Sequence, residues 1–162
     1  MRAPYQVLVL PYKTEKSDIK FAIFKRADLN YWQGIAGGGE EGETALQSAG
    51  REILEEARLN VESNLMQLDS VSSLPVEHVI GRFLWGEDVY VIPEYAFGVE
   101  VADQEITLSR EHSSFKWVSY DKAIEALKWD SNKTALWGLN ERLKKRTIKK
   151  ENNAKIKTRL ME

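Results

Sequence analysis

The residues best suited to chemistry in this sequence are glutamates on one short segment. Glu52, Glu55 and Glu56 stand three and four positions apart, so on a helix their carboxylates would share one face. Like charges at this spacing destabilise a helix by about 0.2–0.5 kcal/mol per pair, and Arg51 is the cation placed to offset them. A hard divalent cation, Mg²⁺ or Mn²⁺, would relieve the repulsion, because it takes carboxylate oxygens and leaves positions for water and phosphate. A solvated acidic helix face is the alternative interpretation.

Three consecutive glycines, residues 37–39, precede this segment. Without Cβ atoms they let backbone groups approach a ligand closely, and a main-chain carbonyl there could complete the coordination of a metal. Thr44 and Gln47 have the spacing of a capping box, which predicts a helix over residues 44–57. Ala49 and Ile53 lie on an apolar strip of that helix, which would dock it on a sheet and leave the carboxylates on the other side.

The elements that must position this helix are read from the rest of the pattern. Runs rich in β-branched and aromatic residues predict strands at residues 5–12, 18–25, 65–72, 89–101 and 114–118, with the first two forming an antiparallel pair. Helices are predicted over residues 120–129 and 133–144, the second capped by Asn132 and packed through Leu136, Leu139 and Leu143. Residues 75–87 fit no element and are interpreted as a functional loop. This order predicts an α/β (α+β) domain, a mixed sheet with helices packed on it.

Composition narrows the class of protein. The chain has 162 residues, a net charge of −2 and no cysteine, and it has no apolar run close to the roughly 20 residues that span a bilayer. We therefore expect a cytoplasmic protein that binds no membrane. Residues 141–162 hold nine Lys or Arg and three Asp or Glu, so an acidic body carries a basic tail, which is not typical of a dedicated nucleic-acid binder. The expected organisation is one domain over residues 1–146 and a basic tail over residues 147–162, either a helical extension or disordered.

The glutamate segment resembles the Nudix box, which reads Gly, five residues, Glu, seven residues, then Arg-Glu-apolar-any-Glu-Glu-any-Gly-apolar. The positions that match are Gly37, Glu43, Arg51, Glu52, Ile53, Glu55, Glu56 and Leu59. The one departure is Arg58, which stands where the box has its late glycine. That glycine resembles a helix C-terminal residue with positive φ, which another residue can adopt at a cost of about 1 kcal/mol. The departure therefore concerns the turn and no metal ligand.

The resemblance implies a Nudix-like α/β/α sandwich, with helices on both sides of a mixed sheet, that hydrolyses phosphoanhydrides with Mg²⁺ or Mn²⁺. It implies that Glu55 and Glu56 are metal ligands together with the Ala36 carbonyl, and that Glu52 is a ligand or the general base. Arg51 would orient these carboxylates, with Glu43 in support. Glu111 lies where the family often has an acidic residue, so it is a second candidate for the base and for a metal ligand; a solvated loop residue is the alternative.

Flanking residues further resemble bacterial dihydroneopterin triphosphate pyrophosphatases, notably KRADLNYWQGIAGGGEEGET and EHSSFKWVSYDKAIEALKWDSNKTAL. This implies a small-molecule substrate, a dihydroneopterin or nucleoside triphosphate cleaved to the monophosphate and pyrophosphate, and a monomer or homodimer. Candidate substrate contacts are Gly37, Gly38, Lys133 and Trp32. Trp32 either stacks on the ring of the substrate or is a core aromatic residue that braces the loop. His112 is either a proton shuttle or a loop residue without a special role. The alternatives are a hydrolase of dinucleoside polyphosphates or nucleotide sugars, and an inactive Nudix module that senses a ligand.

Overall fold

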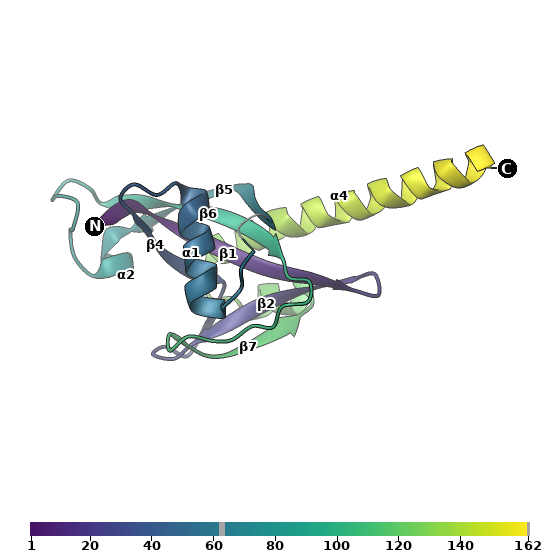
Figure 1. Ribbon diagram of the computed structural model, residues 1–162. Helices are drawn as coiled ribbons and strands as arrows, with labels where there is room; N and C mark the ends of the chain where they lie inside the picture. Colours follow the sequence, from purple (N-terminus) through teal and green to yellow (C-terminus); the bar gives the residue numbers. More distant parts are fainter. Residues whose placement is uncertain (62–63, 162) are drawn as a thin grey trace.

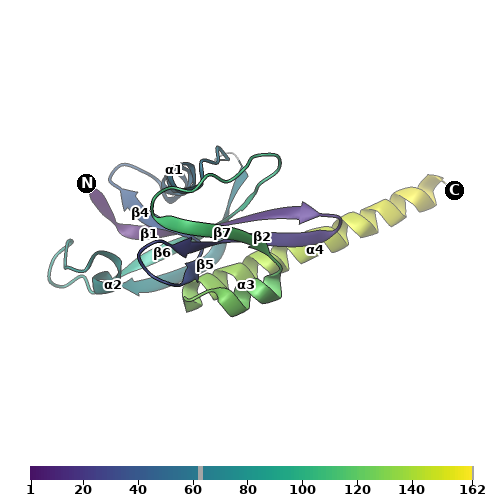
Figure 2. The same cartoon turned by 90° about the horizontal axis from the view of Figure 1, so that it is seen from below.

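The fold is a mixed β-sheet covered by helices on both faces, as the pattern predicts. The computed structural model describes residues 1–61 and 64–161 (Figures 1 and 2). The elements in chain order are β1 Arg2–Glu15, β2 Asp18–Arg26, β3 Trp32–Gln33, β4 Ile35–Glu40, α1 Ala45–Ala57, β5 Leu65–Pro75, α2 Val76–Ile80, β6 Val91–Glu100, β7 His112–Val118, α3 Tyr120–Ala126 and α4 Asp130–Met161.

Strand β1 is the centre of the sheet. Its first part pairs antiparallel with β4, its last part pairs antiparallel with β2, and its other edge pairs parallel with β6. The predicted antiparallel pair of β1 and β2 is confirmed, although both strands reach further than predicted. Lys16 and Ser17, with φ of 46° and 75°, form the two-residue turn between them, which is the backbone that joins tightly paired strands.

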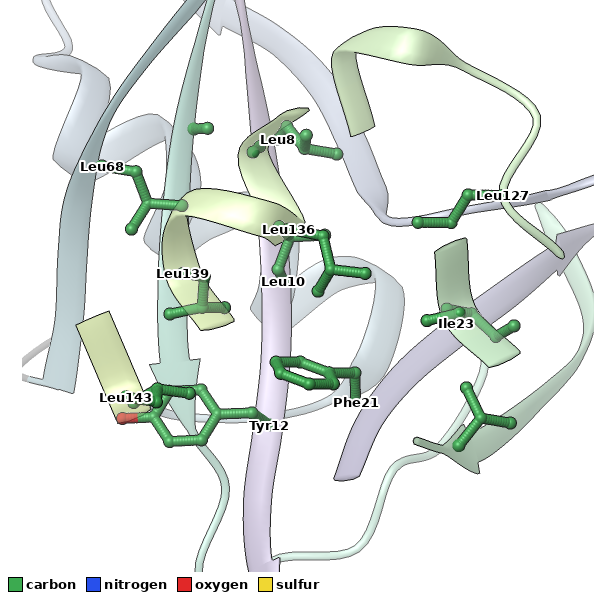
Figure 3. Close-up of a cluster of buried hydrophobic side chains, with 14 residues drawn as sticks. Leu8, Leu10, Tyr12, Phe21, Ile23, Leu68, Leu127, Leu136, Leu139 and Leu143 are labelled. Carbon is green, nitrogen blue, oxygen red and sulfur yellow. The ribbon is translucent and has the colours of Figure 1, made fainter. Parts of the chain in front are cut away.

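Alternation along β1 divides the core into two layers. Val7 and Val9 face α1, whose Ala49, Ile53 and Ala57 cover them. Leu8 and Leu10, which alternate with them along β1, face the opposite way, toward α3 and α4. Figure 3 shows this second layer, in which the predicted leucine stripe of α4 is buried, with the labelled residues Leu8, Leu10, Tyr12, Phe21, Ile23, Leu68, Leu127, Leu136, Leu139 and Leu143.

The boundaries of the last two helices differ from the predicted ones. Helix α3 ends at Ala126, three residues early, because Leu127 forms a bridge with Trp32 and the Lys128 N–H donates to the Trp32 carbonyl at 3.0 Å. The prediction that Asn132 caps the last helix is wrong, because α4 already begins at Asp130. The buried Asn132 Oδ1 instead accepts from the Gly34 N–H at 2.8 Å, which ties the start of α4 to the link between β3 and β4.

Helix α4 is much longer than the part that packs on the sheet. Its last buried residue is Leu143, and the helix continues away from the body to Met161 (Figure 1). Arg146, one turn further, still contacts the sulfur of Met66 on β5 at 3.1 Å. Among the described residues, no helix is long and apolar enough to cross a membrane.

Candidate active site

Helix α1 presents the glutamates and begins and ends as predicted. The Thr44 hydroxyl accepts from the Gln47 N–H at 3.2 Å and the Gln47 side chain accepts from the Thr44 N–H at 2.9 Å, which forms the capping box. At the other end Arg58 has φ 57°, and its N–H donates to the Leu54 carbonyl at 3.0 Å. Arg58 therefore takes the positive-φ conformation of the glycine that it replaces, and the departure from the box leaves the turn in place.

The three glutamates of the helix converge. Glu52, Glu55 and Glu56 each offer a carboxylate oxygen, and these oxygens lie within 4.8 Å of one another. Glu52 and Glu56 are buried, whereas Glu55 is exposed. Burial raises the pKa of Glu52 to about 7; Arg51 lowers it in part, and the neighbouring carboxylates raise it further. The cluster is thus short of positive charge, and its all-oxygen donor set fits a hard divalent cation.

Arg51 ties the cluster to the preceding loop. Its guanidinium donates to the Glu43 carboxylate at 2.9 Å, to Glu52 at 2.8 Å and to the Gly38 carbonyl at 2.8 Å, and it lies 3.5 Å from Glu55. The hydrogen bonds from Arg51 are the main reason that the pKa of Glu43 falls to about 2. Arg51 therefore holds α1, β4 and the loop between them in one arrangement, and it orients Glu52.

The glycine run is explained by close approaches of side chains. A Cβ atom on Gly37 would overlap the Glu52 carboxylate, one on Gly38 would overlap the Arg2 guanidinium, and one on Gly39 would overlap the Tyr5 ring. Such overlaps are far below any normal carbon contact, so larger residues there would displace these groups. The glycines thus make room for two charged side chains and one aromatic ring beside the backbone of β4.

A loop before β7 brings further groups to Glu56. The Ser109 hydroxyl donates to the Glu56 carboxylate, and the Ser109 N–H donates to the Glu56 carbonyl at 3.2 Å. His112 Nδ1 lies 3.6 Å from the same carboxylate, and burial lowers the pKa of His112, which favours its neutral form. The same Ser109 hydroxyl accepts from the Glu111 N–H at 3.2 Å. This loop therefore fixes the backbone of Glu111 beside α1.

The carboxylates form part of the lining of a cleft of about 440 Å³. The predicted site residues in its lining are Ala36, Gly37, Gly38, Glu52, Glu55, Glu56 and Glu111. Two other predicted substrate contacts are not in that lining. Trp32 packs on the core beside α3, with Lys116 Nζ 4.5 Å from the centre of its ring, and Lys133 stands in the first turn of α4 next to the cleft-lining Asn132.

The cleft also contains residues that sequence reasoning missed. They are Arg2, Gln6, Arg26, Tyr31, Gln33, Leu74, Pro75, His78, Val79, Glu94, Trp129 and Ser131. Four of them come from the end of β5 and from α2, so part of the segment interpreted as a functional loop does reach the cleft. For Glu94 the sequence does contain an indication of a special role. It is an acidic residue in the otherwise apolar stretch VIPEYAFGV, and a buried glutamate is rare unless it is paired.

Comparison with known proteins agrees with this geometry. The family model of the NUDIX domain matches residues 4–137. The dihydroneopterin triphosphate diphosphatase of Haemophilus influenzae is 32% identical over 134 residues, which cover 80% of this chain and 83% of that protein. The asymmetrical bis(5'-nucleosyl)-tetraphosphatase of Sus scrofa is 29% identical over 125 residues, covering 76% and 80%. A NUDIX hydrolase structure from Listeria monocytogenes superposes with a TM-score of 0.79 at 43% identity, covering 89% and 97%.

The chain belongs to the Nudix family and is a Nudix hydrolase. The predicted fold and the predicted family are both confirmed.

Proposed function

We propose that this hydrolase cleaves a dihydroneopterin or nucleoside triphosphate to the monophosphate and pyrophosphate. The observation that supports it is the convergence of the three helix glutamates, with Arg51 beside them, at one wall of a cleft large enough for a nucleotide-sized ligand. The relationship to the Haemophilus influenzae diphosphatase supports the class of substrate.

The proposed metal ligands are Glu52, Glu55 and Glu56, with the Ala36 carbonyl and Glu111 as further oxygen donors. All five residues line the cleft, and Mg²⁺ or Mn²⁺ prefers such a set. When bound, the cation would neutralise phosphate charge and lower the pKa of a water molecule. Arg51 would keep Glu52 oriented through its 2.8 Å hydrogen bond.

The reaction requires a base for the attacking water. The oxygen of the water forms a bond to one phosphorus, and the P–O bond to the leaving group breaks. A carboxylate, acting as the base, takes the proton that the water loses. Glu52 is one candidate, because its buried carboxylate lines the cleft and is oriented by the hydrogen bond from Arg51. Glu111 is the second candidate, since it lines the same cleft from an exposed loop.

The remaining walls fit the rest of such a substrate. Tyr31 and Trp129 meet edge to face with ring centres 5.5 Å apart, and both line the cleft. We propose that they, rather than Trp32, provide the aromatic contact for the ring, while Gly37 and Gly38 lie beside the phosphates and Lys133 stands nearby. The cytoplasmic location and the monomeric or homodimeric state stay predictions.

A substrate panel tests this proposal. Pyrophosphate and phosphate release would be measured with Mg²⁺ on dihydroneopterin triphosphate, common nucleoside triphosphates and a dinucleoside tetraphosphate. We expect pyrophosphate from the triphosphates, and at least a hundredfold lower turnover by Glu56→Gln with an unchanged circular dichroism spectrum. Faster cleavage of the dinucleoside tetraphosphate would instead favour the activity for which the Sus scrofa relative is named. No Mg²⁺-dependent cleavage of any compound would refute the proposal.

A further inference from the structure

A buried carboxyl group lies in the cleft away from the metal-type cluster. Glu94 is only 4% exposed and lies on β6, whereas the clustered glutamates lie on α1. The sheet register places Gly38, Gln6 and Glu94 in one row across β4, β1 and β6. Because neighbouring strands are about 4.8 Å apart, Glu94 stands about 10 Å along the sheet from Gly38. The cleft therefore contains two carboxylate regions, Glu94 on β6 and the clustered glutamates on α1.

A directed chain of hydrogen bonds leads to Glu94. Arg2 Nη2 donates to Gln6 Oε1 at 3.2 Å, and Gln6 Nε2 donates to Glu94 Oε2 at 3.1 Å. A guanidinium has no acceptor, so it fixes which end of the Gln6 amide is the oxygen and turns the amide nitrogen toward Glu94. Glu94 is consequently the final acceptor of the chain. A carboxylate has about four lone-pair sites, and Gln6 occupies one of them.

Glu94 has both apolar and polar neighbours in the cleft. Ser72 pairs with Glu94 in the β5–β6 register, and Leu74 follows two residues later on the same face of the sheet and lines the cleft. Ser131, at the start of α4, lies near the carboxyl group. Burial raises the pKa of Glu94, and Gln6 and Ser131 lower it in part. Additional N–H donors from a ligand would compensate the buried charge.

We propose that Glu94 selects the ring of the substrate, by accepting hydrogen bonds from the adjacent ring N–H and exocyclic amino group of a 2-amino-4-oxopyrimidine, as in guanine and dihydropterin. This inference rests on the proposed function and narrows its class of substrate. A carboxylate accepts two parallel N–H bonds from such an edge. Adenine, cytosine and uracil lack that pair of neighbouring donors, and hypoxanthine keeps the ring N–H but lacks the amino group.

The test compares guanosine and inosine triphosphates, which differ only in that amino group. We expect the wild-type protein to have a kcat/KM about tenfold to a hundredfold higher for the guanosine compound. Glu94→Gln keeps the size of the side chain and an acceptor for Gln6, but it turns an amide N–H₂ toward the ligand. The preference should then fall to about threefold or less. Glu100→Gln is the matched control, because it removes the same charge from the exposed end of the same strand and should keep the preference.

Binding separates this inference from the proposed function. The affinities of guanosine and inosine monophosphates for the three proteins would be measured by calorimetry, without any turnover. If no triphosphate is cleaved but guanosine monophosphate binds more tightly through Glu94, the proposed function fails and the role of Glu94 stands. The proposed role of Glu94 would be overturned by either of two results. The wild-type protein could show equal kcat/KM and equal affinity for the guanosine and inosine compounds, or Glu94→Gln could keep the wild-type preference.

Discussion

The Glu52 carboxylate lies directly against the backbone of Gly37, in the space that a Cβ atom at residue 37 would occupy. Gly37 and Glu52 are fifteen residues apart in the sequence and come from β4 and α1. The first glycine of the box and its first clustered glutamate thus form one structural unit, in which a missing side chain on the strand makes room for a carboxylate from the helix.

This contact predicts a large effect of Gly37→Ala. The methyl group would displace Glu52 from the other carboxylates, so we expect at least a hundredfold loss of kcat/KM and weaker binding of Mn²⁺, measured by electron paramagnetic resonance. Gly138→Ala is the control, because a Cβ on that residue of α4 meets nothing within 4 Å. It should raise stability by about 0.5–1 kcal/mol and leave activity unchanged. Normal Mn²⁺ affinity in Gly37→Ala would show that Glu52 can move without cost.

The raised pKa of Glu52 predicts how stability depends on pH in the metal-free protein. Its pKa is about 7 in the folded state and 4.5 in the unfolded state, so the folded state holds the proton more tightly. The contribution of Glu52 to stability is complete below pH 4.5 and is lost as pH rises through about 7, up to about 3 kcal/mol in total.

Denaturation by urea in the presence of EDTA measures this effect. Between pH 5 and pH 8 the free energy of unfolding should fall more steeply for the wild type than for Glu52→Gln. Mg²⁺ should reduce the difference, because a bound cation favours the carboxylate. Parallel curves for the two proteins would mean that Glu52 titrates normally.

Arg58 gives a prediction about stability alone. Its φ of 57° is a conformation that glycine adopts without strain. We expect Arg58→Gly to raise the free energy of unfolding by up to about 1 kcal/mol, and Arg58→Val to lower it, because a β-branched side chain fits this conformation poorly. Thermal denaturation would measure both. Neither variant should change kcat, and a loss of activity in Arg58→Gly would reveal a role for the arginine in the site.

The outer part of α4 should be dispensable for the fold. From residue 148 onward the described residues are exposed, and Leu143 is the last buried one. We propose that residues 1–146 are the hydrolase domain, so a chain ending at Arg146 should keep its kcat/KM and its midpoint in urea. Keeping Arg146 retains the contact with Met66. A drop of more than about 1 kcal/mol in stability would show that the basic tail supports the domain.

The parts of the site that could be predicted from the sequence are those held by contacts between residues close together in the chain. Glu52, Glu55 and Glu56 were found because helical spacing alone brings them together. The end of α1 was predictable because the late glycine of the box, here Arg58, marks the C-terminal position of the helix. Glu94 could not be assigned to the cleft from the sequence, because its place there depends on β1, β5, β6 and α4 meeting, and no local pattern encodes that meeting. The same limit explains Asn132, which was predicted to cap its own helix and instead binds the backbone of Gly34.

The aromatic residues illustrate a second limit. The sequence leaves Trp32 either stacking on the substrate or packing in the core. In the structure Trp32 packs on the core, and its neighbour Tyr31 lines the cleft. In extended backbone, adjacent side chains point to opposite sides, so neighbours such as Tyr31 and Trp32 have different surroundings, and the sequence does not show which of them faces the cleft. The partner of Tyr31, Trp129, lies almost a hundred residues further on, beyond the reach of any local signal.

The central place of β1 has a consequence for how the chain folds. Half of its pairing is with β6, whose matching residues Glu94–Glu100 come more than eighty positions later. During synthesis at roughly 5–20 residues per second, the strand would wait on the order of 4–18 seconds for that partner. Contacts of such long range slow folding, and until they form, the apolar run VLVLPY of β1 has one open edge. We therefore expect the pairing of β1 with β6 to limit the rate of refolding. Helix α1, which carries the glutamates, can form much earlier because its contacts are local.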